Sequence, residues 1–210
     1  MLAVFKTIEL AALISTLASL ASAGLDLGSI LHNALSRKLR RRLMDSFEIV
    51  MLGVSELGRP LPGMALVACT AALLALLRKR LEAVFVLATV SGPAISYLLK
   101  TLTRRARPGP GFDDGILSYF GRYSFPSGHV VFFEVFFGFL GHLAFTFLGG
   151  VYRWLLVMGC SLPILLVGPS RVFLGAHWAS DVAGGYIIGW LWLVVLMAIY
   201  RKAIRLFRGC

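Results

Sequence analysis

Long apolar stretches separated by short polar ones dominate the hydropathy pattern of this 210-residue chain. A helix needs about 20 mostly apolar residues to cross a bilayer. Six stretches approach that length, at residues 7–24, 61–77, 81–99, 129–149, 153–169 and 182–200. The pattern therefore predicts an all-α integral-membrane protein with six transmembrane helices.

A different pattern occupies residues 28–58, between the first two predicted spans. Apolar residues recur there at helical spacing, and basic residues crowd the remaining positions. The basic residues are Arg37, Lys38, Arg40, Arg41 and Arg42. This pattern is typical of amphipathic helices that lie in the membrane interface. We expect one or two such helices, which either gather anionic lipids or simply anchor the chain.

The connection at residues 100–128 contrasts with the spans. It is rich in arginine and contains the run Pro108-Gly109-Pro110-Gly111, which breaks regular structure. We expect a loop that carries chemistry. The sequence contains no internal repeat, so residues 1–210 are predicted to form one membrane-embedded domain.

Composition excludes a water-soluble globule, because 58% of the residues are hydrophobic and only 15% are charged. The net charge is +11. No basic segment is interleaved with aromatic residues, so we expect no nucleic-acid partner. Anionic lipid headgroups or a phosphorylated substrate fit the charge better. The three cysteines, Cys69, Cys160 and Cys210, are too scattered for a disulfide framework or a zinc site.

Three short polar stretches at the ends of predicted spans carry the candidate chemistry. They are Lys100 with Arg107-Pro108, Pro126-Ser127-Gly128-His129, and Ser170-Arg171 with His177 and Asp181. In order and spacing they resemble the three signature motifs of the type 2 phosphatidic acid phosphatase superfamily. That superfamily also includes glucose-6-phosphatases, bacterial acid phosphatases and vanadium haloperoxidases. The motifs cover only residues 100–181.

The residues themselves fit a bound phosphate. Lys100, Arg107 and Arg171, called here the phosphate clamp, would supply three positive charges, and arginine can contact phosphate oxygens in a bidentate fork. Snorkelling to lipid headgroups is the alternative for Arg171. Ser127 and Gly128 precede a predicted helix whose free N–H groups and dipole favour an anion. We therefore expect all five residues to bind phosphate.

Two histidines and one carboxylate are the predicted catalytic residues. His177 and Asp181 are four residues apart, so on a helix Asp181 can accept a hydrogen bond from Nδ1 of His177 and leave Nε2 bare as a nucleophile. The resemblance implies that His177 forms a phosphohistidine and that His129 protonates the leaving oxygen. His129 would then activate the hydrolytic water.

No metal ion and no other cofactor is expected in this scheme, because the phosphate clamp takes the place of Mg²⁺. Asp113 and Asp114 lie in the same loop and are the only other metal-ligand candidates. Adjacent side chains diverge, so we expect them to be solvated or to contact the substrate headgroup.

Several residues inside the spans also stand out. Glu134, Gly138 and His142 form one helical stripe and should face the bundle. One role for these residues is hydrogen bonding between helices. For Glu134, the alternative is to tune the pKa of His129 or to line a lipid groove. Gly185 and Gly189 form a G-x-x-x-G pattern, which permits close packing against a neighbouring helix.

These observations predict an integral-membrane, metal-independent phosphatase that removes a terminal phosphate from a lipid phosphate or diphosphate. The spans imply that substrate arrives from the bilayer. The small size resembles bacterial enzymes that act on undecaprenyl diphosphate, phosphatidylglycerol phosphate or phosphatidic acid, and among these we favour a polyprenyl diphosphate. A lipid phosphotransferase, a non-enzymatic lipid carrier and a vanadate-dependent oxidase are the alternatives. The scheme requires no oligomer.

Basic residues also predict the orientation in the membrane. Nine cations remain on each side once the phosphate clamp is set aside. The tight turn Arg78-Lys79-Arg80 and four cations beside the last span place both termini in the cytoplasm. We expect a multi-pass protein of the inner (plasma) membrane with its active site on the outer, periplasmic face. The resemblance to bacterial enzymes points the same way.

Overall fold

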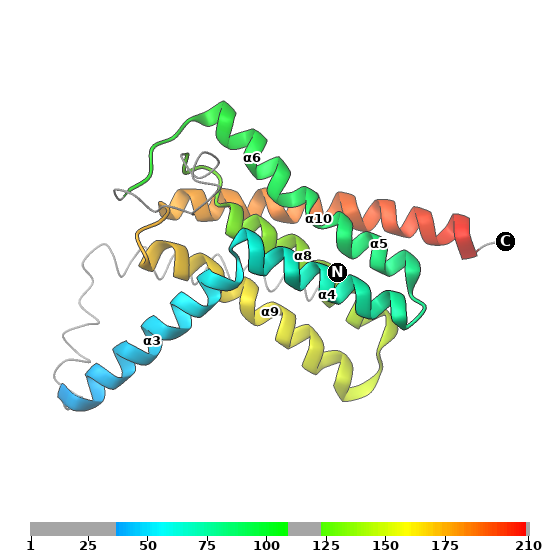
Figure 1. Cartoon of the computed structure of the whole chain (residues 1–210), viewed down its shortest axis with the longest axis horizontal. Coiled ribbons are helices and arrows are strands. Elements are labelled where there is room, and N and C mark those ends of the chain that lie inside the picture. The colour runs from blue at the N-terminus through cyan, green and yellow to red at the C-terminus, as the bar shows by residue number, and fades with distance from the viewer. Residues whose placement is uncertain (1–36, 109–122, 209–210) are drawn as a thin grey trace.

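The computed structural model describes residues 37–108 and 123–208, and no strand occurs in these two stretches. Their helices are α3 (Arg37–Leu57), α4 (Pro60–Leu76), α5 (Arg80–Ala88), α6 (Ser91–Thr103), α8 (Gly128–Phe147), α9 (Gly150–Phe173) and α10 (Ala179–Arg208). Helix α10 runs along the longest axis of the molecule (Figure 1), and α8 packs against it. The predicted all-α class is confirmed for the part of the chain that the structure describes.

Four segments are long and apolar enough to cross a membrane: Arg80–Thr103, Gly128–Phe147, Gly150–Phe173 and Ala179–Phe207. The first of them combines α5 and α6. A fifth is added if the bent pair Met44–Leu57 and Pro60–Leu76 counts as one span. Five of the six predicted stretches thus coincide with helices. The predicted span at 7–24 lies outside the described residues, so the count of six stays a prediction.

Helices α3 and α4 meet at a sharp bend. Arg59 has extended backbone, with φ −66° and ψ 153°, and Pro60 follows it as the first residue of α4. Proline disfavours helix in the preceding residue but suits the first position of a helix. The two helices consequently differ in direction by 69°.

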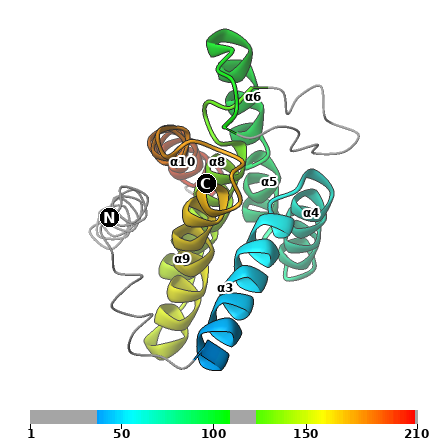
Figure 2. The same cartoon turned by 90° about the vertical axis from the view of Figure 1, so that its left-hand side faces the viewer.

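The predicted amphipathic segment corresponds to α3 from residue 37 onward, and its residues 28–36 lie outside the described part of the chain. Helix α3 packs against α9, and the two are neighbours in Figure 2. Met51 and Ser55 are buried, whereas Ile49 is 68% exposed. Placement of α3 in the membrane interface stays a prediction.

Helix α8 forms the centre of the bundle. Every residue from Val130 to Phe136 is buried, because α5, α6, α9 and α10 all contact this helix. A helix that is apolar on all sides is typical of such a buried position. Its phenylalanines pack on one another, with the rings of Phe132 and Phe136 stacked at a centroid distance of 5.5 Å. In lipid, such van der Waals packing is a main source of helix association.

Glycines make the contact between α8 and α10 unusually close. A Cβ atom on Gly185 would lie 3.0 Å from Cβ of Val130, and one on Gly189 would lie 2.8 Å from Cβ of Glu134. The predicted packing role of this glycine pair is confirmed. The close contact also brings the first turn of α10, which carries Asp181, to the start of α8.

The polar connections gather at the two ends of the bundle as predicted. At one end, Nζ of Lys79, after α4, lies 4.4 Å from the ring centroid of Phe147 at the end of α8. At the other, Nε1 of Trp178 donates a hydrogen bond to the carbonyl oxygen of Ala106 at 3.1 Å. The described connections near residues 100 and 175 therefore share one end. Which side of the membrane that end faces stays a prediction.

Candidate active site

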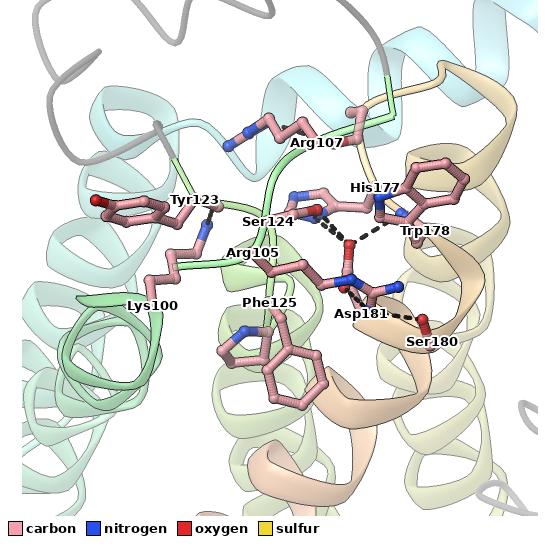
Figure 3. A network of polar contacts seen from close by, with 12 residues as sticks. Lys100, Arg105, Arg107, Tyr123, Ser124, Phe125, His177, Trp178, Ser180 and Asp181 are labelled. Atoms are coloured by element: carbon pink, nitrogen blue, oxygen red, sulfur yellow. Dashed lines mark hydrogen bonds and ion pairs between the residues drawn. The ribbon is translucent and has the colours of Figure 1, made fainter. Parts of the chain in front are cut away.

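The eight predicted site residues all lie at the end of the bundle where α6 and α9 end and α8 and α10 begin. Their positions follow from the helix boundaries. Lys100 is in the last turn of α6, Arg107 follows that helix, Ser127 is the N-cap of α8, Gly128 and His129 open α8, Arg171 is in the last turn of α9, His177 precedes α10 and Asp181 is in its first turn. Part of this arrangement is drawn in Figure 3.

The three cations of the phosphate clamp are held by neutral oxygens of other elements. Nζ of Lys100 donates to the Tyr123 carbonyl at 3.2 Å, and Nη1 of Arg107 donates to the Ala176 carbonyl at 3.4 Å. Nη1 of Arg171 donates to the hydroxyl of Ser55. Lys100 and Arg171 are buried, at 7% and 2% exposure. Burying positive charge is costly, so an anion bound among these groups would be strongly favoured.

The carboxylate of Asp181 lies at the centre of a hydrogen-bonded cluster (Figure 3). Its Oδ2 accepts hydrogen bonds from the Trp178 amide, at 2.9 Å, and from the Ser124 hydroxyl. Its Oδ1 forms an ion pair with Nη1 of Arg105 at 2.8 Å. Asp181 is fully buried, and these donors allow it to stay ionised there.

His177 lies beside this carboxylate in a geometry that differs from the predicted one. Its Nδ1 is 3.6 Å from Oδ2 of Asp181, longer than a hydrogen bond. The hydroxyl oxygen of Ser124 lies 3.4 Å from the same nitrogen. The reason is local: His177 belongs to the turn before α10, so the pair does not have the helical i, i+4 geometry that the spacing suggested.

Ser124 and Arg105 are members of the cluster that sequence reasoning missed. They lie 57 and 76 residues from Asp181 along the chain. Both are polar residues within the motif-bearing loop, and that position was the only indication the sequence offered. The Arg105 side chain is 42% exposed, so solvent screens its ion pair and its contribution to stability is small.

The start of α8 presents buried polar atoms with no partner of their own. Ser127 Oγ and His129 Nε2 are buried and accept or donate no hydrogen bond within the described residues. Leaving such groups unsatisfied costs about 1–3 kcal/mol each. Together with the free N–H groups of a 20-residue helix, they form a site suited to a phosphate.

The environment of His177, which lies between the spans, favours the neutral imidazole. Burial, together with the positive charges of Lys100, Arg171 and Arg107, lowers the pKa of His177 to about 4, although its interaction with Asp181 acts in the opposite direction. A neutral imidazole is the form that can attack phosphorus.

A cavity of about 400 Å³ adjoins this polar end of the bundle. Lys100, Arg107, His129 and His177 line one part of it. The rest is lined by residues of α4, α6 and α8 and of the connections beside them, among them Met64, Val67, Val90, Pro93, Ala94 and Phe132. A molecule with a phosphate at one end and a hydrocarbon chain at the other matches both parts.

The polar residues deeper in α8 have no place in this cavity. Glu134 is buried against Gly189 of α10 and does not line the cavity. His142 lies toward the opposite end, with its ring centroid 6.2 Å from that of Tyr200. The stripe therefore faces the bundle as predicted, in the position expected for helix packing.

Metal binding finds no support in the described residues, where no group of three or more His, Cys, Asp or Glu side chains could hold an ion. Asp113 and Asp114 lie outside the described residues. The expected independence from metal stays a prediction.

Comparison with known proteins identifies the family. The PAP2 superfamily model matches residues 81–205, more than half of the chain and all three motifs. The chain belongs to the PAP2 superfamily. The resemblance inferred from the motifs is confirmed, and with it the assignment of this PAP2 protein as a phosphatase.

Named relatives of this PAP2 protein act on different lipids. Phosphatidylglycerophosphatase B of Bacillus subtilis is 28% identical over 165 residues, which cover 76% of this chain and 77% of the relative. Lipid A 1-phosphatase of Rhizobium etli is 32% identical over 54% of this chain and 48% of its own. Undecaprenyl-diphosphatase of Sulfolobus acidocaldarius is 34% identical over 32% of this chain and 29% of its own.

A solved structure shares the fold. The crystal structure of a transmembrane PAP2 type phosphatidylglycerolphosphate phosphatase from Bacillus subtilis superimposes with a TM-score of 0.63. The match covers 94% of this chain and 97% of that one, at 22% sequence identity. This likeness confirms the fold as that of a membrane PAP2 protein.

The pH dependence of kcat/KM tests the electrostatic environment of His177. Lys100 lowers the pKa of His177, so Lys100→Gln should raise that pKa. A protonated imidazole is not a nucleophile, so the acidic limb of the pH profile should move to higher pH. Titration of the substrate phosphate is common to both proteins and cancels in the comparison. Lys202→Gln, at an exposed lysine near the other end of α10, is the control. An acidic limb that stays in place, or moves to lower pH, would contradict the assignment.

Proposed function

We propose that this PAP2 protein hydrolyses the terminal phosphate of a membrane lipid phosphate or diphosphate through a phosphohistidine on His177. The observation that carries the proposal is that one cavity is lined both by Lys100, His129 and His177 and by apolar side chains. A soluble phosphate ester would have no use for the apolar part.

In the first step the phosphate clamp and the start of α8 bind the terminal phosphate. Nε2 of His177 attacks phosphorus in line, the bond to the leaving oxygen breaks, and His129 gives a proton to that oxygen. The carboxylate of Asp181, held in place by its hydrogen-bond donors, stabilises the imidazolium that forms. Positive charge placed around the transferring group stabilises the transition state in this dry site.

In the second step water replaces the leaving group. His129, now neutral, takes a proton from the water as its oxygen attacks phosphorus, and the bond between Nε2 of His177 and phosphorus breaks. Inorganic phosphate leaves, and both histidines return to their starting protonation states. Attack by an alcohol instead of water would make the protein a phosphotransferase.

Two lipid classes are the leading substrates. The relative that covers most of this chain is named as a phosphatidylglycerophosphatase, which favours phosphatidylglycerol phosphate. A polyprenyl diphosphate is the class that we favoured at the outset, and a shorter match to an undecaprenyl-diphosphatase supports that class. Both carry a terminal phosphate on a hydrocarbon-bearing molecule and meet the requirements of the cavity.

Phosphate release by purified protein in detergent tests the proposed function. The panel comprises phosphatidate, phosphatidylglycerol phosphate, and isoprenyl monophosphates and diphosphates. We expect release from at least one lipid, little effect of a chelator because the phosphate clamp already supplies positive charge, and competitive inhibition by vanadate, which mimics the five-coordinate transition state. His177→Ala is the inactive control. No release from any lipid would favour a carrier, and a requirement for Mg²⁺ after full chelation would contradict the metal-independent mechanism.

Blocking the apolar part of the cavity should separate lipid substrates from soluble ones. Ala94 lines the cavity, and Ala94→Trp should lower kcat/KM for a long-chain lipid phosphate by about tenfold, which equals the loss of about two methylene contacts. Turnover of p-nitrophenyl phosphate should change little. Leu98→Trp is the matched control, because Leu98 lies one turn further along α6 and is 59% exposed. Equal losses with both substrates would show that the cavity does not hold the lipid chain.

A further inference from the structure

The C-terminal turn of α3 contacts the active site although it lies outside the segment that matches the family model. Ser55 is 6% exposed, and its hydroxyl accepts a hydrogen bond from Nη1 of Arg171. One residue of α3 thus contacts a phosphate-binding cation.

Gly58, just after α3, restrains the catalytic histidine His129. A Cβ atom at this position would lie 2.4 Å from Cδ2 of His129 and 2.8 Å from Cε2 of Phe133. Separations under about 3 Å are not tolerated, so any side chain here must displace the imidazole. The backbone of Gly58 therefore packs directly against the His129 ring.

The turn is itself fixed to the helix that carries Arg171. The hydroxyl of Ser170 donates to the carbonyl oxygen of Met51 at 2.7 Å. The rings of Phe47 and Phe173 meet edge to face at a centroid distance of 5.1 Å. Helix α3 is thus held on α9 by contacts on both sides of Arg171, and Ser55 has a defined place relative to the guanidinium group.

We propose that residues 55–58, the α3 positioning turn, orient two active-site groups, an inference that rests on the proposed function. The Ser55 hydroxyl turns the guanidinium of Arg171 toward the phosphate. Gly58 holds the imidazole of His129 in place with Nε2 toward the leaving oxygen. Ser55 and Gly58 are positioning residues, since neither contacts the reacting atoms.

Vanadate binding measured by calorimetry tests the Ser55 part without requiring turnover. Ser55→Ala removes a hydrogen bond to a charged group, so binding should weaken by about 10- to 100-fold. In an Arg171→Ala background the same substitution should have no further effect, because the hydroxyl acts through Arg171. Ser55→Thr keeps the hydroxyl and should retain most of the affinity. Ser161→Ala is the control, because its hydroxyl bonds only within α9.

The outcomes separate this inference from the proposed function. Unchanged binding in Ser55→Ala, or an equal loss in the Arg171→Ala background, would overturn the role of Ser55. A wild-type protein that binds vanadate with this pattern but releases no phosphate from any lipid would overturn the proposed function and leave the positioning of Arg171 intact.

Leaving-group dependence tests the Gly58 part. Gly58→Ala should displace His129 and lower kcat/KM for a lipid phosphate, whose alkoxide leaving group needs a proton. The loss should be much smaller for p-nitrophenyl phosphate, because p-nitrophenolate leaves without protonation. General damage to the fold would lower both activities alike, and that result would overturn the role of Gly58. Gly159→Ala, at an exposed glycine of α9 with open space around it, is the control.

Discussion

The hydrogen bond from the Ser127 amide to the Asp181 carbonyl, at 3.0 Å, joins the start of α8 to the start of α10. The rest of the site depends on this junction. Gly185 and Gly189 allow the two helices to approach closely enough for it to form. Because His129 follows Ser127 and His177 precedes Asp181, the junction brings both catalytic candidates to one cavity.

The distribution of charge at this junction determines both anion binding and the protonation state of His177. The phosphate clamp places three cations at one end of an apolar bundle. Such a site attracts an anion and at the same time holds His177 neutral, the state in which it can attack. One arrangement of charge therefore serves both binding and chemistry.

Sequence periodicity predicted much of this architecture. Apolar stretches located five helices, and motif spacing predicted that Lys100, His129 and His177 would meet, because those residues sit at span ends on one predicted side. Helical spacing also predicted α3. It did not predict that α3 packs on α9, since an amphipathic face fits a lipid surface and a neighbouring helix equally well.

Contacts between distant segments could not be read from the sequence. Ser124 meets Asp181 across 57 residues, and Ser55 meets Arg171 across 116. Serine is common in loops and helices, so neither residue carried a signature of its own. Nδ1 of His177 faces Asp181 as predicted, but at 3.6 Å the separation is longer than a hydrogen bond, because the exact start of α10 decides whether the two residues have helical spacing.

The central claim is that His177 forms a covalent bond to phosphorus, and trapping the intermediate tests it most directly. Protein turning over a lipid substrate labelled in its terminal phosphate is denatured at alkaline pH, where phosphohistidine survives, and the labelled peptide is identified. The account predicts label on His177 in the wild type and none in His177→Ala. His142→Ala, at a histidine remote from the cavity, should label normally. Label that persists in His177→Ala, or a wild type that turns over without ever acquiring label, would contradict the account.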